Sequence, residues 1–326
     1  MGFRRLDDYP KLVKWYALRR ETLPNGGDPV TAFLHQVCNA LKEDDQRFVK
    51  RFADALATLV THPRGAALCN DVEQALAEKG AVFTELTSEA AELALAHGQG
   101  EQYFDLLRTL GDRTSLATFR FLAAWVALNL NCLEDCIEQC ELVEQPIAQV
   151  QTLHGQALLE SGEAEEAIQV LEAAVHNSPD EVLAWFQLAK AYHVLERYAQ
   201  AIDTVRRLRR IAPQSAEVSL MMAIVVLSSG ANEPTLVLET WRAVSLFVKD
   251  LDGDATNLGY LFDLALRSGE EANMVWLIEN ISWDRARRAE GFTRFVTKAL
   301  RALTPWPRSA QRFIESVSGM TTQSAS

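Results

Sequence analysis

The sequence contains no apolar run approaching the roughly 18 to 20 residues that a membrane-spanning helix needs, so we expect no membrane span. The opening residues, MGFRRLDDYP, are not followed by an apolar segment, which argues against a secretory signal. Gly2 meets only part of the myristoylation pattern, because position 6 is leucine where serine or threonine is required.

Cysteine is scarce and odd in number, with five residues in the chain. Three of them, Cys132, Cys136 and Cys140, are four residues apart, which places their thiols on one helical face where mutual disulfides have poor geometry. This usage favours a reducing cytoplasm. Arginine far outnumbers lysine, which favours a GC-rich and therefore bacterial coding sequence.

Motifs of catalysis and metal binding are missing. The six histidines are scattered with no HExxH spacing, and the sequence has no CxxC pair, no Walker pattern and no GxSxG elbow. We therefore expect no catalytic residue, no metal and no cofactor. The alternative is an enzyme whose activity uses no recognisable motif.

The chain is acidic, with a formal net charge of -12, so nucleic acid is not an expected partner. The charge is uneven. The stretch from Trp283 to Glu315 contains eight basic and three acidic residues, a net +5, so the remainder carries -17. We interpret this stretch as basic capping helices whose apolar face, with Phe295 and Leu303, closes the fold. The alternatives are docking to an acidic partner or to a membrane surface.

Helical periodicity dominates the chain, and runs of alternating β-branched residues are missing. Brief turn signals separate the predicted helices. Asp28-Pro29 can cap and open a helix after the turn PNGG. Breaks are predicted at HPRG (62–65), HGQG (97–100) and TPWP (304–307), and the tail GMTTQSAS is expected to fray.

Two consecutive 34-residue segments share a pattern of large and small residues, with Pro179 and Pro213 at equivalent places. They resemble the tetratricopeptide repeat (TPR) family, most clearly over residues 148–213. The repeat starting at Val182 carries the motif positions best, in Trp185, Leu188, Ala189, Tyr192, Ala201, Val205 and Pro213, with Leu208 where a small residue is usual. The repeat starting at Ala148 supplies Gly155, Leu158, Ala167, Leu171, Ala174 and Pro179, and departs at Gln151 and His154, where large apolar residues are expected.

The resemblance implies an all-α fold, a superhelical array of antiparallel helix hairpins that forms a TPR-like α-solenoid. The predicted organisation is an N-terminal helical region over 1–113, a repeat array over 114–282, basic capping helices over 283–318 and a disordered tail over 319–326. The N-terminal region is either a set of divergent repeats or a separate helical domain. Residues 256–282 look like another hairpin of the same size.

The repeat register offers an explanation of the cysteines. With a repeat starting at Ala117, Cys136 and Cys140 fall at positions that face the first helix of the same hairpin, and Cys132 falls at the start of the second helix. Cysteine is small and apolar enough to pack there. The alternative, a metal or redox site, lacks a fourth ligand and a known spacing.

The resemblance further implies that repeat positions 2, 5, 9, 12 and 13 line a concave groove. The predicted partner-binding residues are mainly apolar: Phe121, Trp125, Leu128, Thr152, Gln156, Leu159, Leu183, Phe186, Lys190, His193, Leu220 and Ile224. They do not reproduce the carboxylate clamp by which some relatives bind acidic chaperone tails, so we expect no such binding. The groove either takes a peptide or is filled by another part of the same chain.

The preferred hypothesis is a non-enzymatic scaffold or adaptor that binds a partner protein or peptide in this apolar groove. One alternative is a scaffold that assembles into a homo-oligomer. Another is an enzyme or regulator with activity in the N-terminal region. The sequence leaves the oligomeric state and the partner open.

Overall fold

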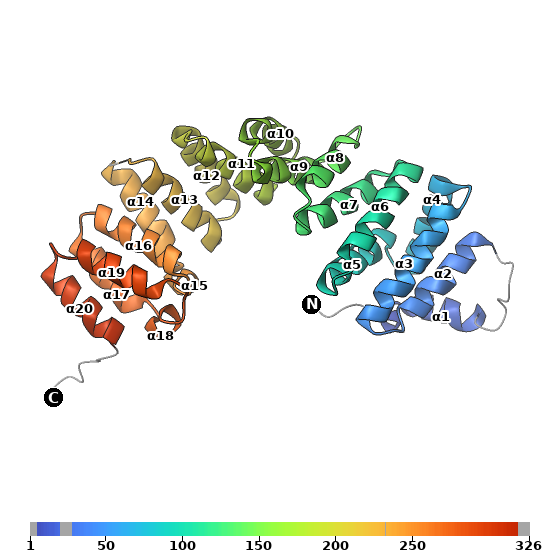
Figure 1. Ribbon diagram of the computed structural model, residues 1–326, viewed down its shortest axis with the longest axis horizontal. Coiled ribbons are helices and arrows are strands. Elements are labelled where there is room, and N and C mark those ends of the chain that lie inside the picture. The colour runs from blue at the N-terminus through green and yellow to red at the C-terminus, as the bar shows by residue number, and fades with distance from the viewer. Residues whose placement is uncertain (1–4, 20–27, 232, 319–326) are drawn as a thin grey trace. The chain divides into compact units, whose positions relative to one another are not determined.

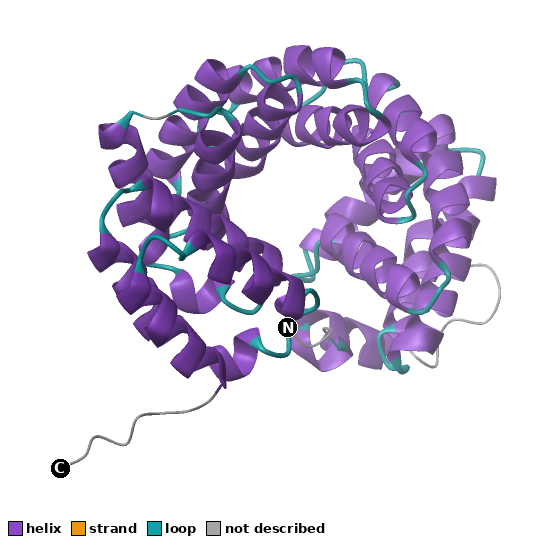
Figure 2. Cartoon of the chain, turned by 60° about the vertical axis from the view of Figure 1, so that its left-hand side comes forward, coloured by secondary structure: helices purple, strands orange, loops and turns teal. Residues whose placement is uncertain are grey.

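The computed structural model describes residues 5–19, 28–231 and 233–318. Every regular element in these ranges is a helix, as Figure 2 shows, so the all-α prediction is confirmed. The chain divides into two compact units, residues 1–177 and 178–326. The division falls between Asn177 and Ser178, between the two best-matching repeats. Each unit is described separately below.

Unit 1 ends in two antiparallel hairpins. Their helices are α7 (Ala117–Asn129), α8 (Leu133–Glu141), α9 (Ala148–Ser161) and α10 (Ala164–Asn177). Each helix packs against the next, and α7 also contacts α9. Small residues at the predicted positions are buried at the crossings, among them Ala124, Gly155 and Ala167. Small side chains let the helix axes approach, and large neighbours such as Leu171 fill the space between them.

The N-terminal helices belong to the same compact unit. They are η1 (Leu6–Asp8), α1 (Pro10–Arg19), α2 (Pro29–Ala40), α3 (Asp45–Thr61), α4 (Gly65–Ala77), α5 (Phe83–Ala96) and α6 (Gly100–Thr114). The long helix α3 packs against α2, α4, α5 and α6, while α5 and α6 both pack against α7. The aromatic core here includes Phe33, Phe83 and Phe119, whose rings meet edge to face.

Unit 2 is a stack of hairpins (Figure 1). It consists of α11 (Val182–Val194), α12 (Tyr198–Ile211), α13 (Ala216–Ser228), α14 (Pro234–Ser245), the single-turn α15 (Val248–Leu251), α16 (Ala255–Arg267), α17 (Glu271–Asn280), the single-turn α18 (Trp283–Ala286), α19 (Phe292–Ala302) and α20 (Pro307–Ser318). The hairpin predicted over 256–282 is present as α16 and α17. First helices stack on first helices, because α16 packs on both α13 and α19.

An aromatic cluster closes unit 2. Phe313 of α20 is fully buried, and its ring meets the rings of Phe262, Phe295 and Trp283 at centroid distances of 5.3, 6.1 and 5.4 Å. Arg287 donates hydrogen bonds to the carbonyl oxygens of Ser316 and Val317, at the C-terminal end of α20. The apolar face of the basic stretch therefore packs inward and its charged face is exposed, as the sequence indicates.

The turn signals end helices where expected. HPRG separates α3 from α4, HGQG separates α5 from α6, and TPWP separates α19 from α20. Asp28 caps α2 by accepting a hydrogen bond from the Thr31 amide, with Pro29 at the first helical position. The PNGG turn and the tail lie outside the described residues. Within the described ranges, no helix combines the length and the apolar character that crossing a membrane requires.

Candidate partner-binding faces of the two units

The first-helix face of unit 1 is the exposed side of α7 and α9. Phe121, Trp125 and Leu128 are half-buried on α7 and pack against the core of the unit. On α9, Gln156 and Leu159 are half-buried as well. These side chains keep part of their surface in water, as residues that meet a partner must.

Thr152 differs from the other predicted groove residues. Its side chain is 3% exposed, and its hydroxyl donates to the carbonyl oxygen of Ala148 in the same helix at 2.7 Å. This bond uses the hydroxyl donor inside the helix. Thr152 is therefore a packing residue and offers no surface to a partner. The repeat register placed it correctly on α9, but on the buried side.

The first-helix face of unit 2 is the exposed side of α11 and α13. Leu183 is 47% exposed, and the other predicted residues are half-buried: Phe186, Lys190, His193, Leu220 and Ile224. His193 Nε2 lies 3.0 Å from Ser228 Oγ, which ties α11 to α13. These six residues come from two neighbouring first helices and form one mainly apolar surface with polar points.

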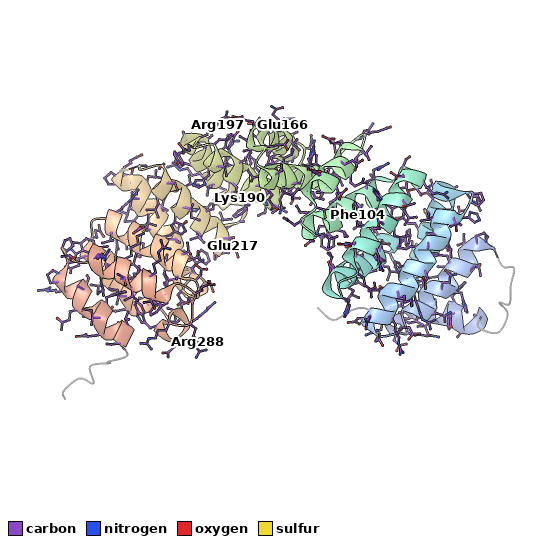
Figure 3. The ribbon with its side chains drawn as sticks, in the orientation of Figure 1. Phe104, Glu166, Lys190, Arg197, Glu217 and Arg288 are labelled. Atoms are coloured by element: carbon purple, nitrogen blue, oxygen red, sulfur yellow. The ribbon has the colours of Figure 1, made fainter. Side chains whose placement is uncertain are left out.

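Glu217 belongs to this face and was missed from the sequence. Figure 3 shows Glu217 at the start of α13 on the same side of unit 2 as Lys190, with Arg197 on the other side. The Ser215 hydroxyl lies 2.7 Å from the Glu217 carboxylate and holds its pKa below the ordinary value. Glu217 falls at position 2 of the repeat that starts at Ala216, and this position is the signal in the sequence that marks it.

The arginine run RRLRR lies on α12, a second helix. Arg206 and Arg209 both pair with Glu239 of α14, at 3.5 and 3.2 Å, and Arg206 also lies 3.8 Å from Asp203. The Arg207 guanidinium stands 5.7 Å from the centroid of the Trp185 ring. Arg206 and Arg209 therefore belong to a solvated face on which they pair with nearby acids.

The cysteine stretch forms α8, and two of its thiols pack in the core. Cys136 and Cys140 are 0% and 3% exposed, whereas Cys132 is exposed at the N-cap of the helix. A hydrogen bond with Cys136, together with burial, raises the pKa of the Cys140 thiol, which disfavours its reactive thiolate form. Among the described residues, no group of three or more His, Cys, Asp or Glu side chains is placed to hold a metal.

His154 occupies a position of α9 where the repeat favours a large apolar residue. Its Nε2 atom is buried and has no hydrogen-bond partner in the described structure. Burial lowers the pKa of the imidazole from its ordinary value of 6.5, and the nearby carboxylates of Glu141, Glu163 and Glu166 only partly oppose this. The folded state therefore favours neutral His154.

We expect this histidine to make unit 1 sensitive to acid. The pKa of His154 is lower in the folded state than in the unfolded state. As pH falls through about 6.5, the unfolded state therefore binds more protons than the folded state. The stability that neutral His154 allows is thus present above that pH and is lost below it. His154→Leu should raise the free energy of unfolding by about 1 kcal/mol at neutral pH and should reduce its decline between pH 7 and pH 5. Urea titrations of both proteins measure this, with exposed His176→Leu as the control. If the free energy of unfolding of His154→Leu fell between pH 7 and pH 5 as much as that of the wild type, the prediction would be contradicted.

One further hollow was not anticipated from the sequence. It lies between α16 and α19, with a volume of about 400 Å³. Tyr260 and Asp263 line it from α16, and Arg294 and Lys298 line it from α19. The basic stretch that supplies Arg294 and Lys298 is evident in the sequence. The α16 residues that line the hollow lie some thirty residues earlier, in a hairpin that matches the repeat motif only weakly. The i, i+4, i+7 spacing of Arg294, Lys298 and Arg301 was the available signal.

Comparisons with known proteins agree with the hairpin geometry. A family model described as Tetratricopeptide repeat matches residues 152–216. PilF from Pseudomonas aeruginosa is a similar solved structure, with a TM-score of 0.50 and 18% identity over 71% of this chain and 96% of that chain. A tetratricopeptide repeat protein from Parabacteroides merdae gives a TM-score of 0.47 and 10% identity over 89% and 99%.

A comparison with curated proteins gives no match. The family model covers most of α9 and all of α10 to α12, the helices in which small residues lie at the predicted crossings. Residues 152–216 therefore match the tetratricopeptide repeat family in both sequence and helix geometry.

Proposed function

We propose that the protein is a non-enzymatic scaffold or adaptor that binds a partner protein or peptide through its first-helix faces. The observation that carries this proposal is the surface on α11 and α13. There Leu183, Phe186, Leu220 and Ile224 remain partly exposed in an ordered helical stack, beside Lys190. Large apolar side chains that fold into a fixed surface and still face water are typical of binding sites.

The composition of this face favours a peptide or an amphipathic helix. Phe186 and the leucines can anchor apolar side chains, while Lys190, His193 and Glu217 can orient the bound chain through polar contacts. A face with one cation and one carboxylate does not favour a highly charged ligand. On unit 1, Phe121, Trp125, Leu128, Gln156 and Leu159 offer a second face of similar character.

We also place this scaffold in a bacterial cytoplasm. All five cysteines are free, and Cys132 is exposed to solvent as a free thiol. Free thiols persist in a reducing compartment.

The proposal is tested by affinity capture from a native lysate, followed by binding measurements with the purified partner. Phe186→Ala combined with Lys190→Ala is expected to weaken binding by about 2 kcal/mol, roughly a 30-fold rise in Kd, because it removes the central apolar anchor and its neighbouring charge. Isothermal calorimetry on the full chain gives the two dissociation constants.

The matched control is Gln200→Ala with Arg210→Ala, which changes two exposed residues of α12 on the second-helix side. We expect this control to bind as the wild type does. Equal affinity of all three proteins for the same partner would remove the first-helix face of unit 2 as the binding site.

A further inference from the structure

The hollow between α16 and α19 continues along α19. Beyond the part lined by Tyr260 and Asp263, a second depression is lined by Arg294, Thr297, Lys298, Arg301 and Ala302. The two share Arg294 and Lys298, so they form one elongated depression, termed here the α16–α19 hollow. Phe295 lines it and is itself buried, with its ring edge to face with Phe262 at 5.1 Å. The position of α19 is therefore fixed by the core beneath it.

Three cations of α19 line this hollow, and only one of them has a partner. Lys298 Nζ lies 2.9 Å from the Asp263 carboxylate. Arg294 and Arg301 are exposed, and within the described part of the chain neither guanidinium has a carboxylate or carbonyl partner. Arg285, Arg287 and Arg312 of the basic stretch are paired, with Asp252, Asp284 and Glu279. Arg288 and Arg308 are exposed and have no partner among the described residues either, but neither lines the hollow.

Among the unpaired arginines of the basic stretch, Arg294 and Arg301 are the two that line the hollow. Arg294 and Arg301 also lie seven positions apart, which places them on one side of α19 about 10 Å apart along the axis. A peptide in the extended polyproline II conformation rises about 3.1 Å per residue with three residues per turn, so carboxylates three residues apart lie on one side and span about 9 Å. Carboxylate is the group that two exposed guanidinium groups recognise best.

The charges around the hollow favour a peptide over other polyanions. Asp263 and Glu290 line it together with the three cations, which limits its attraction for a continuous phosphate backbone. The remainder of the chain carries -17, and a nucleic acid or an anionic membrane extends over that remainder, whereas a short peptide meets only the hollow. The arginines also border a depression, whereas a membrane surface requires a flat or protruding basic face.

We propose that the α16–α19 hollow binds an extended acidic peptide segment of a partner protein, with two carboxylates three residues apart on Arg294 and Arg301. Tyr260 and Thr297 offer polar contacts to the peptide between these two points. This inference rests on the proposed function, because both concern the recognition of a partner protein. The two proposed sites differ: the hollow consists of residues of α16 and α19 and includes none of the first-helix face on α11 and α13.

The test uses a fluorescein-labelled decapeptide with glutamate at every third position, and a matched decapeptide with glutamine at those positions. Fluorescence anisotropy on the full chain at low salt is expected to show binding of the glutamate peptide and at least about tenfold weaker binding of the glutamine peptide. Arg294→Gln with Arg301→Gln is expected to weaken binding of the glutamate peptide about tenfold, since it removes two exposed ion pairs.

Arg288→Gln with Arg308→Gln is the matched control, because it removes the same charge from exposed arginines of the same stretch outside the hollow. This control is expected to bind within about twofold of the wild type. Equal losses in both double variants, or no binding by the wild type at 100 μM peptide (about -5.5 kcal/mol), would overturn the proposal. Selective binding of phosphatidylserine vesicles or a single-stranded oligonucleotide through Arg294 and Arg301 would overturn it too.

Failure of this proposal is distinguishable from failure of the proposed function. Phe186→Ala with Lys190→Ala leaves the α16–α19 hollow intact, so that variant is expected to bind the glutamate peptide as the wild type does. If it instead lost the glutamate peptide while Arg294→Gln with Arg301→Gln kept it, the acidic segment would belong to the first-helix face and not to the hollow.

Discussion

Replacing Gly155 with valine is expected to destabilise unit 1 by on the order of 3 kcal/mol. A Cβ atom on Gly155 would lie 2.7 Å from Leu171 Cδ2 and closer still to Leu171 Cγ. Leu171 is itself fully buried, so it cannot move aside without displacing its neighbours. At this position α9 and α10 leave no room for a Cβ atom unless Leu171 shifts.

The alanine variant separates crowding from backbone effects. Glycine inside a helix costs about 1 kcal/mol relative to alanine, so Gly→Ala in an open place should stabilise. Gly259→Ala in α16 is the matched control, because a Cβ there meets no atom within 4 Å. We expect Gly155→Ala to destabilise by about 1 to 2 kcal/mol and Gly259→Ala to stabilise by up to about 1 kcal/mol.

A double variant identifies Leu171 as the obstacle. Leu171→Ala alone should cost about 2 to 5 kcal/mol through the cavity that it leaves. Combined with Gly155→Ala, the total loss should be smaller than the sum of the two single losses, because the added methyl group occupies that cavity. Hydrogen exchange read out on the peptides of α9 and α10 localises the effect to unit 1. Strict additivity would mean that the two residues do not crowd each other.

The repeat over 148–213 could be predicted because each motif position has a local physical role. Small residues at Gly155 and Ala189 predict close helix approach, and Pro179 and Pro213 predict where a second helix has ended. Cys136 and Cys140 followed from the same register, since both fall on the face that meets α7, and both are buried. Here the sequence pattern and the packing depend on the same side-chain sizes.

The repeat register predicted on which helix a residue lies better than it predicted whether the side chain of that residue is exposed. Thr152 fell on the expected helix, but it is buried, because the side on which a residue lies also depends on how closely its neighbours pack. The N-terminal helices could not be placed on the repeat from the sequence. Helix α3 contacts four other helices, so its apolar residues serve several interfaces at once. Interfaces of that kind leave no fixed spacing in a sequence.

The α16–α19 hollow shows a different limit. Its cations are visible as a helical stripe on α19, but the sequence does not show that Arg294 and Arg301 combine a place in the hollow with the absence of a partner in the described structure. Lys298 follows the same stripe and is neutralised by Asp263, which lies 35 residues earlier. Whether a charged side chain has an ion-pair partner depends on tertiary contacts. The sequence could therefore predict a basic helix, but it could not predict which of its cations have no partner within the protein.

Phe313→Ala is expected to have the largest effect in unit 2, a loss of about 3 to 5 kcal/mol. The ring is 0% exposed and contacts three other aromatic rings contributed by α16, α18 and α19. Truncation would leave a cavity at the point where these helices meet α20, and close packing around it limits collapse. The adjacent Ile314 is 54% exposed, so Ile314→Ala is the matched control and should cost less than about 0.5 kcal/mol.

Urea unfolding and tryptic digestion under native conditions measure the two parts of this effect. In Phe313→Ala we expect an earlier urea transition and faster cleavage after the arginines of α19 and α20, because local opening of the cap requires less free energy. Since the cap holds α19 against α16, the variant should also lose affinity for the acidic decapeptide although it alters no residue of the hollow. Unchanged cleavage together with unchanged peptide affinity would show that α20 covers unit 2 without stabilising it, and the aromatic cluster would then have no part in forming the hollow.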